Sequence, residues 1–171
     1  DTFEPFTLIS LPIPESDEKV SLNDCLSTFT KCETLKGDEK WKCKHCDKKV
    51  EATKTISLWT LPPILVIHFK RTVKKGYRKE KISTEIDFPI SGLQLDDQFS
   101  ELHRPNVSPK YDLYAISNHT GMPDGGHYFS YCQNMINKKW FEFNDRHVLH
   151  ISDENSIVSD KAYVLFYKRR V

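Results

Sequence analysis

The chain has 171 residues, a length that suits one domain with a hydrophobic core. Hydrophobic residues make up 38% and charged residues 29%, which is typical of a globular protein and excludes a disordered one. The formal net charge of +1 gives no overall attraction to nucleic acid or to anionic membranes, and no apolar run approaches the ~20 residues of a membrane helix. We therefore expect no nucleic-acid partner and no membrane insertion.

The five cysteines are odd in number and unevenly spaced. This argues against a disulfide framework and for a reducing compartment, where cysteines bind metal or take part in chemistry. Residues 1–5 have neither the basic start nor the apolar segment of a secretory signal. The expected location is intracellular, either cytoplasmic or nuclear.

The first part of the chain predicts a strand, a helix, a hairpin and a second strand. Residues 6–12 read as a strand that Pro12 ends. Ser21 is a suitable N-cap for a helix. The apolar stripe of that helix is formed by Leu22, Cys25, Leu26 and Phe29. Residues 41–61 predict a hairpin, and the continuous apolar run of residues 64–69 predicts a strand buried on both faces.

The second part of the chain is also rich in strand signals. A basic segment around Gly76 reads as a solvated loop, because only Tyr77 could stack on a nucleic-acid base. Residues 82–88 alternate as a strand, and residues 91–110 read as loop. Apolar strands are predicted at residues 111–117, 128–132, 139–143 and 162–167. A short helix near residues 152–158, capped by Ser152, completes a fold of the α+β class around an antiparallel sheet.

A Cys-x-x-Cys turn suggests a metal site. Cys43 and Cys46 supply two thiolates, half of what a structural Zn²⁺ requires, and His45 between them is expected to be exposed. Cys25 is expected to pack on the helix stripe, while Cys32 could be a third ligand but has no partner turn. The residues leave open a half zinc ribbon, completed by cysteines outside this chain, or a degenerate site without metal. A redox pair is less favoured, because no βαβ pattern surrounds the turn.

A second constellation suggests acid–base chemistry. Glycines at positions 121, 125 and 126 predict a tight, movable loop before His127. Gly125 and Gly126 also remove side chains beside the imidazole, which would leave space for an extended peptide. The pattern fits a general base that is presented to a substrate.

Asn144 follows His127 by 144 − 127 = 17 residues, enough for an antiparallel return strand to bring the two together. The asparagine oxygen would then accept from the imidazole Nδ1–H, leaving Nε2 to face a thiol. Asp145 would orient a water or the substrate, or replace Asn144 if the strand is bulged. Spacing alone favours a simpler reading, in which the histidine is a surface residue and Asn-Asp is a turn pair.

The order and spacing of the motifs resemble those of ubiquitin-specific proteases, the peptidase C19 family of deubiquitinases. The resemblance runs nearly end to end. Its motifs lie at residues 3–6, 11–13, 21–26, 41–46, 52–54, 61–71, 111–114, 117–119, 125–128, 140–145 and 162–167. One departure is Thr72, which stands where phenylalanine usually follows Lys-Arg.

The resemblance implies a papain-like cysteine protease fold, with fingers at about residues 1–12 and 38–61 and palm elsewhere in 1–171. It implies His127 as general base, Asn144 as third triad member and Asp145 as an acid tied to oxyanion stabilisation. The residues implied to contact substrate are Gly125, Gly126, Tyr128, Met122 and Tyr77. Cys43 and Cys46 would hold one structural zinc with two cysteines outside this chain, and no catalytic cofactor is implied.

The implied function is thiol-dependent hydrolysis of the bond after the C-terminal glycine of ubiquitin, with ubiquitin and ubiquitinated proteins as partners. The family's nucleophilic cysteine, oxyanion asparagine, thumb and first zinc-binding Cys pair are expected before residue 1, so this segment alone is expected to be inactive. The alternative is a non-catalytic ubiquitin-binding module. A zinc-ribbon module for nucleic acid has only two ligands and one basic segment in its favour.

Overall fold

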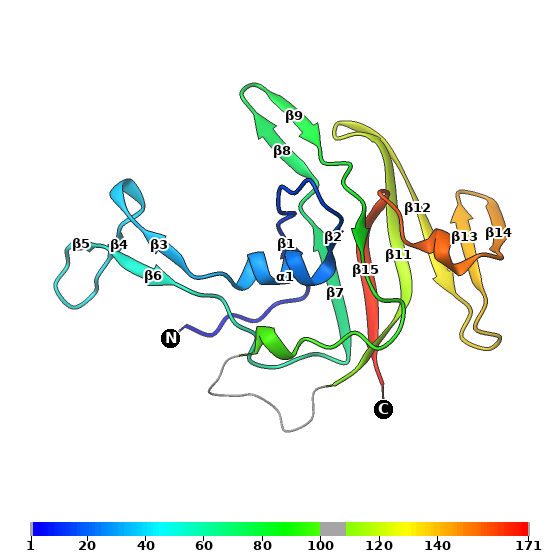
Figure 1. Ribbon diagram of the computed structural model, residues 1–171, viewed down its shortest axis with the longest axis horizontal. Helices are drawn as coiled ribbons and strands as arrows, with labels where there is room; N and C mark the ends of the chain where they lie inside the picture. Colours follow the sequence, from blue (N-terminus) through cyan, green and yellow to red (C-terminus); the bar gives the residue numbers. More distant parts are fainter. Residues whose placement is uncertain (1, 100–108, 171) are drawn as a thin grey trace.

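A seven-stranded sheet dominates the computed structural model, which describes residues 2–99 and 109–170 (Figure 1). The strands lie in the order β1-β7-β15-β11-β12-β13-β14. Their bounds are β1 Ile9–Leu11, β7 Ile64–Phe69, β15 Ala162–Arg169, β11 Tyr111–Met122, β12 Gly125–Gln133, β13 Trp140–Asn144 and β14 His147–Ile151. All neighbours are antiparallel except β1 and β7. The predicted α+β class with an antiparallel sheet is confirmed.

Helix α1, Leu22–Thr30, lies against the β1 end of this sheet (Figure 1). It begins with a capping box: Ser21 Oγ accepts from Asp24 N at 3.2 Å, and the Asp24 carboxylate accepts from Ser21 N at 2.8 Å. The predicted stripe packs into the core. Burial raises the pKa of the Cys25 thiol to about 11, so this cysteine packs as an apolar group, as expected.

The core lies on one face of the sheet, and β7 shows this clearly. Leu65, Ile67 and Phe69 are fully buried, whereas His68 between them is only half-buried. The prediction of a strand buried on both faces is therefore wrong. The second face of β7 carries a polar and aromatic contact, in which His68 Nδ1 lies 3.0 Å from Ser10 Oγ and its ring meets Tyr163 edge-on.

A fully buried guanidinium ties the end of β7 to its surroundings. Arg71 Nε donates to the carbonyl of Ala162 at 2.7 Å, and Nη1 donates to the carbonyls of Ile82 at 3.0 Å and Thr84 at 2.7 Å. These three bonds join β15 and the segment after residue 81 to the core strand. The charge is therefore compensated by carbonyl dipoles rather than by a carboxylate within bonding distance.

Two short ladders extend away from the large sheet (Figure 1). They pair β3 Glu33–Leu35 with β6 Ala52–Lys54, and β4 Trp41–Lys42 with β5 Lys49–Val50. The predicted hairpin is present as β4 and β5. Strand β3 was not predicted, because its side chains are mostly exposed and show no apolar alternation.

The basic segment predicted as a loop is a hairpin instead. Its strands are β8 Thr72–Lys75 and β9 Arg78–Lys81, joined by Gly76, with a φ of +61°, and a fully exposed Tyr77. Charged residues make up all of β9 and the second half of β8, so no apolar alternation marks the two strands. A cross-strand ion pair between Lys75 and Glu80, with Nζ and Oε2 2.9 Å apart, supports the pairing.

The remaining elements are short. The predicted strand at residues 82–88 is reduced to β10 Ile86–Asp87, which pairs with β2 Val20–Ser21. The predicted helix near residues 152–158 is the 3₁₀ turn η4 Glu154–Ile157. Asp153, not Ser152, caps it, since its carboxylate accepts from Asn155 N at 3.0 Å. Two further 3₁₀ turns are η1 Gly37–Glu39 and η2 Asp96–Gln98. Among the described residues, no helix is long and apolar enough to cross a bilayer.

Candidate active site

The hairpin of β11 and β12 carries the candidate base. The two strands pair as far as Met122 with Gly125, which leaves a two-residue turn of Pro123 and Asp124. The movable glycine loop predicted before His127 is therefore wrong, because Gly125 and Gly126 already belong to the ladder. Pairing across this ladder satisfies the backbone polar groups that a loop would leave to solvent.

Gly126 is required by its neighbour on β11. A Cβ at this position would overlap the imidazole of His119 and lie 2.5 Å from the carbonyl oxygen of Thr120, whereas Gly125 has open space around it. His119 is buried and packs against the ring of Tyr128, with centroids 4.6 Å apart. The space expected for substrate beside Gly126 is thus filled by the protein itself, and only the space beside Gly125 is open.

The predicted return strand brings Asn144 to His127. The Oδ1 atom of Asn144, the last residue of β13, lies 2.8 Å from Nε2 of His127 on β12. A carbonyl oxygen only accepts hydrogen bonds, so His127 donates from Nε2–H and Nδ1 keeps its lone pair. The expected roles of the two nitrogens are therefore reversed. Asn144 lies at the end of the neighbouring strand β13, where Nε2, the ring nitrogen farther from the backbone of His127, reaches it.

Glu142 adds a third member that the sequence did not reveal. Its Oε1 accepts from Nδ2 of Asn144 at 3.2 Å. The two residues lie two apart on β13, and therefore on the same face of the sheet. The only sequence signal was this spacing, which is common to every strand.

Asp145 lies in the tight turn that follows. It is exposed and has a φ of +51°, and with Arg146 it joins β13 to β14. Aspartate tolerates this left-handed conformation better than most residues. In the described part of the chain no hydrogen bond or ion pair of its carboxylate is recorded, so the structure brings His127 and Asn144 together and leaves Asp145 beside them.

The residues predicted to contact substrate are exposed apolar side chains on two hairpins. Met122 and Tyr128 belong to the β11–β12 hairpin, and Tyr77 lies at the turn between β8 and β9. An ion pair joins the two hairpins, with Lys79 Nζ 2.7 Å from Asp124 Oδ1. Both hairpins point to the same end of the molecule (Figure 1).

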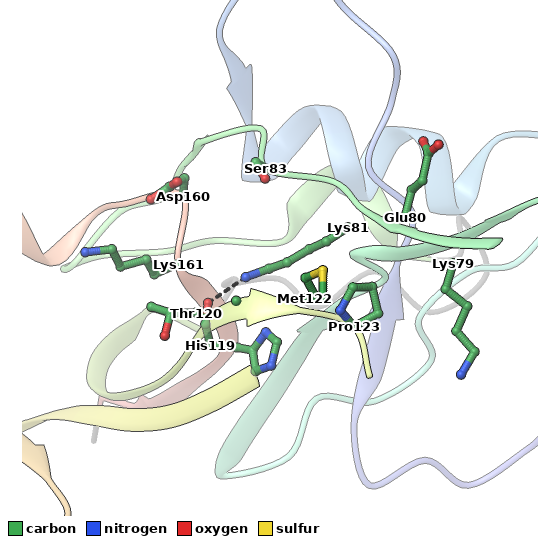
Figure 2. Close-up of a pocket in the computed structure, with 11 residues that line it drawn as sticks. Lys79, Glu80, Lys81, Ser83, His119, Thr120, Met122, Pro123, Asp160 and Lys161 are labelled. Atoms are coloured by element: carbon green, nitrogen blue, oxygen red, sulfur yellow. Dashed lines mark hydrogen bonds between the residues drawn. The ribbon is translucent and has the colours of Figure 1, made fainter. Parts of the chain in front are cut away.

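A cavity of about 560 Å³ lies between these hairpins (Figure 2). Lys79 and Lys81 line it from β9, Met122 from β11, and Asp160 and Lys161 from the segment before β15. The Lys81 ammonium donates to the carbonyl of His119 at 2.7 Å, as the dashed line in Figure 2 marks. Sequence reasoning identified the basic segment but not this cavity, which forms only when the two hairpins fold side by side.

The Cys-x-x-Cys turn lies between β4 and β5. Backbone N–H groups of Cys46 and, to a smaller degree, His45 lower the pKa of the Cys43 thiol, which favours the thiolate that zinc requires. Cys46 is exposed and could bind the same ion. No group of three or more metal-binding side chains occurs within residues 2–99 and 109–170. The turn therefore fits two ligands of a tetrahedral site.

None of the five cysteines, all of which are described, lies against His127. Cys132 is five residues along β12, about 17 Å away on a strand, and alternation places it on the opposite face. Cys25 is buried in the core. The other three cysteines lie outside this hairpin: Cys32 directly precedes β3, and Cys43 and Cys46 lie between β4 and β5.

The sheet-dominated fold with few helices is a papain-like fold, as the family model and the solved structures described next show. The family model described as ubiquitin carboxyl-terminal hydrolase matches residues 10–167, and the chain belongs to this family. This confirms the family predicted from the sequence motifs.

Close relatives support the same assignment. The chain is 40% identical over 171 residues to ubiquitin carboxyl-terminal hydrolase 4 of Bos taurus, covering 99% of this chain and 17% of the relative. It is 42% identical over 158 residues to hydrolase 15 of Homo sapiens, covering 92% of this chain and 16% of the relative. The chain thus spans about a sixth of the length of these relatives.

Solved structures match over nearly the whole chain. The SAGA DUB module of Ubp8, Sgf11, Sus1 and Sgf73 bound to monoubiquitin gives a TM-score of 0.82 at 32% identity, covering 99% of this chain and 36% of that chain. The same module bound to ubiquitin aldehyde gives a TM-score of 0.82 at 31% identity, covering 99% of this chain and 37% of that chain.

Proposed function

We propose that this chain supplies the histidine base and its orienting asparagine to a deubiquitinase. The observation that carries the proposal is the 2.8 Å contact between His127 Nε2 and Asn144 Oδ1. It leaves Nδ1 as the only basic atom of the ring, which is what a thiol nucleophile needs beside it. Because none of the chain's own cysteines lies there, we assign the nucleophile to residues of the full protein outside 1–171.

The proposed reaction is an acyl transfer in two stages. His127 Nδ1 takes the proton of the thiol, and the thiolate sulfur attacks the carbonyl carbon of the C-terminal glycine of ubiquitin. The C–S bond forms, the C–N bond breaks, and Nδ1–H gives its proton to the leaving amine. Water then attacks the thioester while His127 takes a proton from it. The C–S bond breaks, Nδ1–H returns its proton to the leaving sulfur so that the thiol is restored, and the released carboxyl group of ubiquitin gives up the second water proton to solvent.

Ubiquitin is the proposed partner, and ubiquitinated proteins are the proposed substrates. Support comes from the solved Ubp8 modules, which are bound to monoubiquitin or ubiquitin aldehyde. The open space beside Gly125 and the exposed side chains of Met122, Tyr128 and Tyr77 are suited to an extended tail. We assign Asp145 to the same site, as an acid that polarises the reacting region.

The other assignments are structural. We propose that Cys43 and Cys46 hold half of one structural Zn²⁺, with two cysteines from outside this chain, and that no catalytic cofactor is used. The fingers comprise about residues 1–12 and 38–61, and the palm comprises the remainder of a catalytic domain that extends beyond 1–171. The proposed location is intracellular, cytoplasmic or nuclear.

The experiment is hydrolysis of a ubiquitin–fluorophore conjugate by the full-length protein. His127→Ala should abolish turnover while ubiquitin binding remains. His150→Ala is the matched control, because this exposed histidine on β14 only meets the ring of Phe141. Turnover that survives in His127→Ala would remove the histidine from the reaction.

A non-catalytic ubiquitin-binding module is the second candidate. The observation in its favour is that none of the five cysteines of residues 1–171 lies beside His127. A full-length wild-type protein that binds ubiquitin but does not hydrolyse the conjugate would establish it in place of the hydrolase.

A further inference from the structure

Glu142 lies behind the candidate base on the face of β13 that also carries Asn144. Its carboxylate oxygen Oε1 accepts from Asn144 Nδ2 at 3.2 Å, and the pair is partly buried. The register places Glu142 opposite Tyr131 on β12. Burial and, to a smaller degree, the charge of Glu142 raise the pKa of the Tyr131 phenol. Glu142 is thus bonded to Asn144 and lies across from Tyr131 in the ladder.

The orientation of the Asn144 amide decides what His127 can do. The two ends of an asparagine amide have nearly the same shape, but one accepts and the other donates hydrogen bonds. If the amide turned over, its Oδ1 would face the carboxylate of Glu142, and two acceptors would repel each other. The ionised carboxylate therefore selects the orientation in which Nδ2 faces Glu142 and Oδ1 faces His127.

The orientation of the Asn144 amide in turn determines the tautomer of the His127 imidazole. With Oδ1 against it, Nε2 carries the proton and Nδ1 carries the lone pair. With the amide reversed, Nδ2 would face Nε2, and Nδ1 would carry the proton. Only the first arrangement leaves a base on the side of the ring away from Asn144. His127 is exposed, so water alone would not choose between the two orientations.

We propose that Glu142 is a positioning residue, which fixes the Asn144 amide and, through it, the tautomer in which His127 Nδ1 acts as base. The inference rests on the proposed hydrolase function. Glu142 contacts neither the base nor a reacting atom and acts only through Asn144. Its loss should therefore slow the chemical step and leave substrate binding unchanged.

The test measures kcat and KM of the full-length protein with a ubiquitin–fluorophore conjugate. Glu142→Ala should lower kcat about three- to tenfold, the range expected for one lost hydrogen bond, with KM unchanged. Glu142→Gln keeps an acceptor oxygen and should retain kcat within about twofold of wild type. Glu85→Ala is the control, because this exposed carboxylate before β10 has no recorded partner among the described residues.

A double-mutant cycle identifies the route of the effect. Glu142→Ala should have no further effect in an Asn144→Ala background, because the residue it positions is gone. The inference is overturned by a Glu142→Ala variant as fast as wild type, by a Glu142→Gln variant as slow as Glu142→Ala, or by a loss that persists without Asn144. An inactive wild-type protein, or an active His127→Ala variant, would instead overturn the proposed function.

Discussion

Replacing Gly126 by alanine tests the close packing of this residue, near the start of β12, against His119 on β11. The new methyl group would overlap the His119 ring and lie 2.5 Å from the Thr120 carbonyl oxygen. The backbone atom cannot move aside without breaking the ladder, so the ring must turn out of its buried site. It then loses its stacking on Tyr128 and Tyr163, whose centroids lie 4.6 and 5.6 Å away.

The cost can be worked out from these contacts. Overpacking costs about 1–3 kcal/mol, and each aromatic contact contributes about 0.5–1.5 kcal/mol beyond its buried area. Gly126→Ala should therefore lower the free energy of unfolding by about 2–6 kcal/mol. Gly125→Ala is the matched control, since nothing lies within 4 Å of its new atom, and it should change stability by less than about 0.5 kcal/mol.

The assay is urea unfolding of the full-length protein, followed by fluorescence. Adding His119→Ala to Gly126→Ala removes the ring clash and leaves only the close contact with the Thr120 carbonyl oxygen, so the double variant should be more stable than the sum of the two single changes predicts. If Gly126→Ala unfolds at the same urea concentration as Gly125→Ala, the close packing of His119 on the strand is not present in solution.

Three further predictions concern stability and metal. Burial and, to a smaller degree, the charge of Lys81 lower the pKa of His119 in the folded protein. The unfolded chain therefore binds more protons than the folded one, and the free energy of unfolding should fall as pH drops below about 6.5. The urea midpoints at pH 7.5 and 5.5 should differ less in His119→Phe than in the wild type. An equal difference in both proteins would exclude His119 as a source of the pH dependence. Arg71→Leu removes three hydrogen bonds of a buried guanidinium and should lower the unfolding free energy by about 3 kcal/mol or more. An unchanged urea midpoint would show that these bonds contribute nothing net. Elemental analysis of the full-length protein should give one zinc per chain, and Cys43→Ser should lose both the zinc and folding stability. A wild-type protein without zinc would show that the Cys43 turn is a degenerate site that binds no metal.

The elements that the sequence predicted well carry local signals. Ser21 and Asp24 form the capping box, and the 17-residue interval between His127 and Asn144 forms the return hairpin. Each depends on residues close in sequence, so spacing and residue type were enough. The roles of His127 and Asn144 in catalysis rest on the family and stay a proposal.

The features that were missed depend on distant contacts. β14 is an edge strand with mostly exposed side chains, and β8 and β9 carry charges on both faces, so neither shows an apolar period. Which nitrogen of His127 meets Asn144 follows from the position of Asn144 at the end of β13. The burial of His119 beside Gly126 depends on a pairing between strands, and a single sequence does not reveal it.

The ion pair between Lys79 and Asp124 has a consequence for access to the cavity beside it. Both side chains are more than half exposed, and such pairs contribute only about 0–1 kcal/mol. Thermal energy is therefore enough to break this ion pair, and salt weakens it further. The bond from Lys81 to the His119 carbonyl still joins the two hairpins, so the ion pair itself presents only a small barrier to a chain that enters the cavity between them.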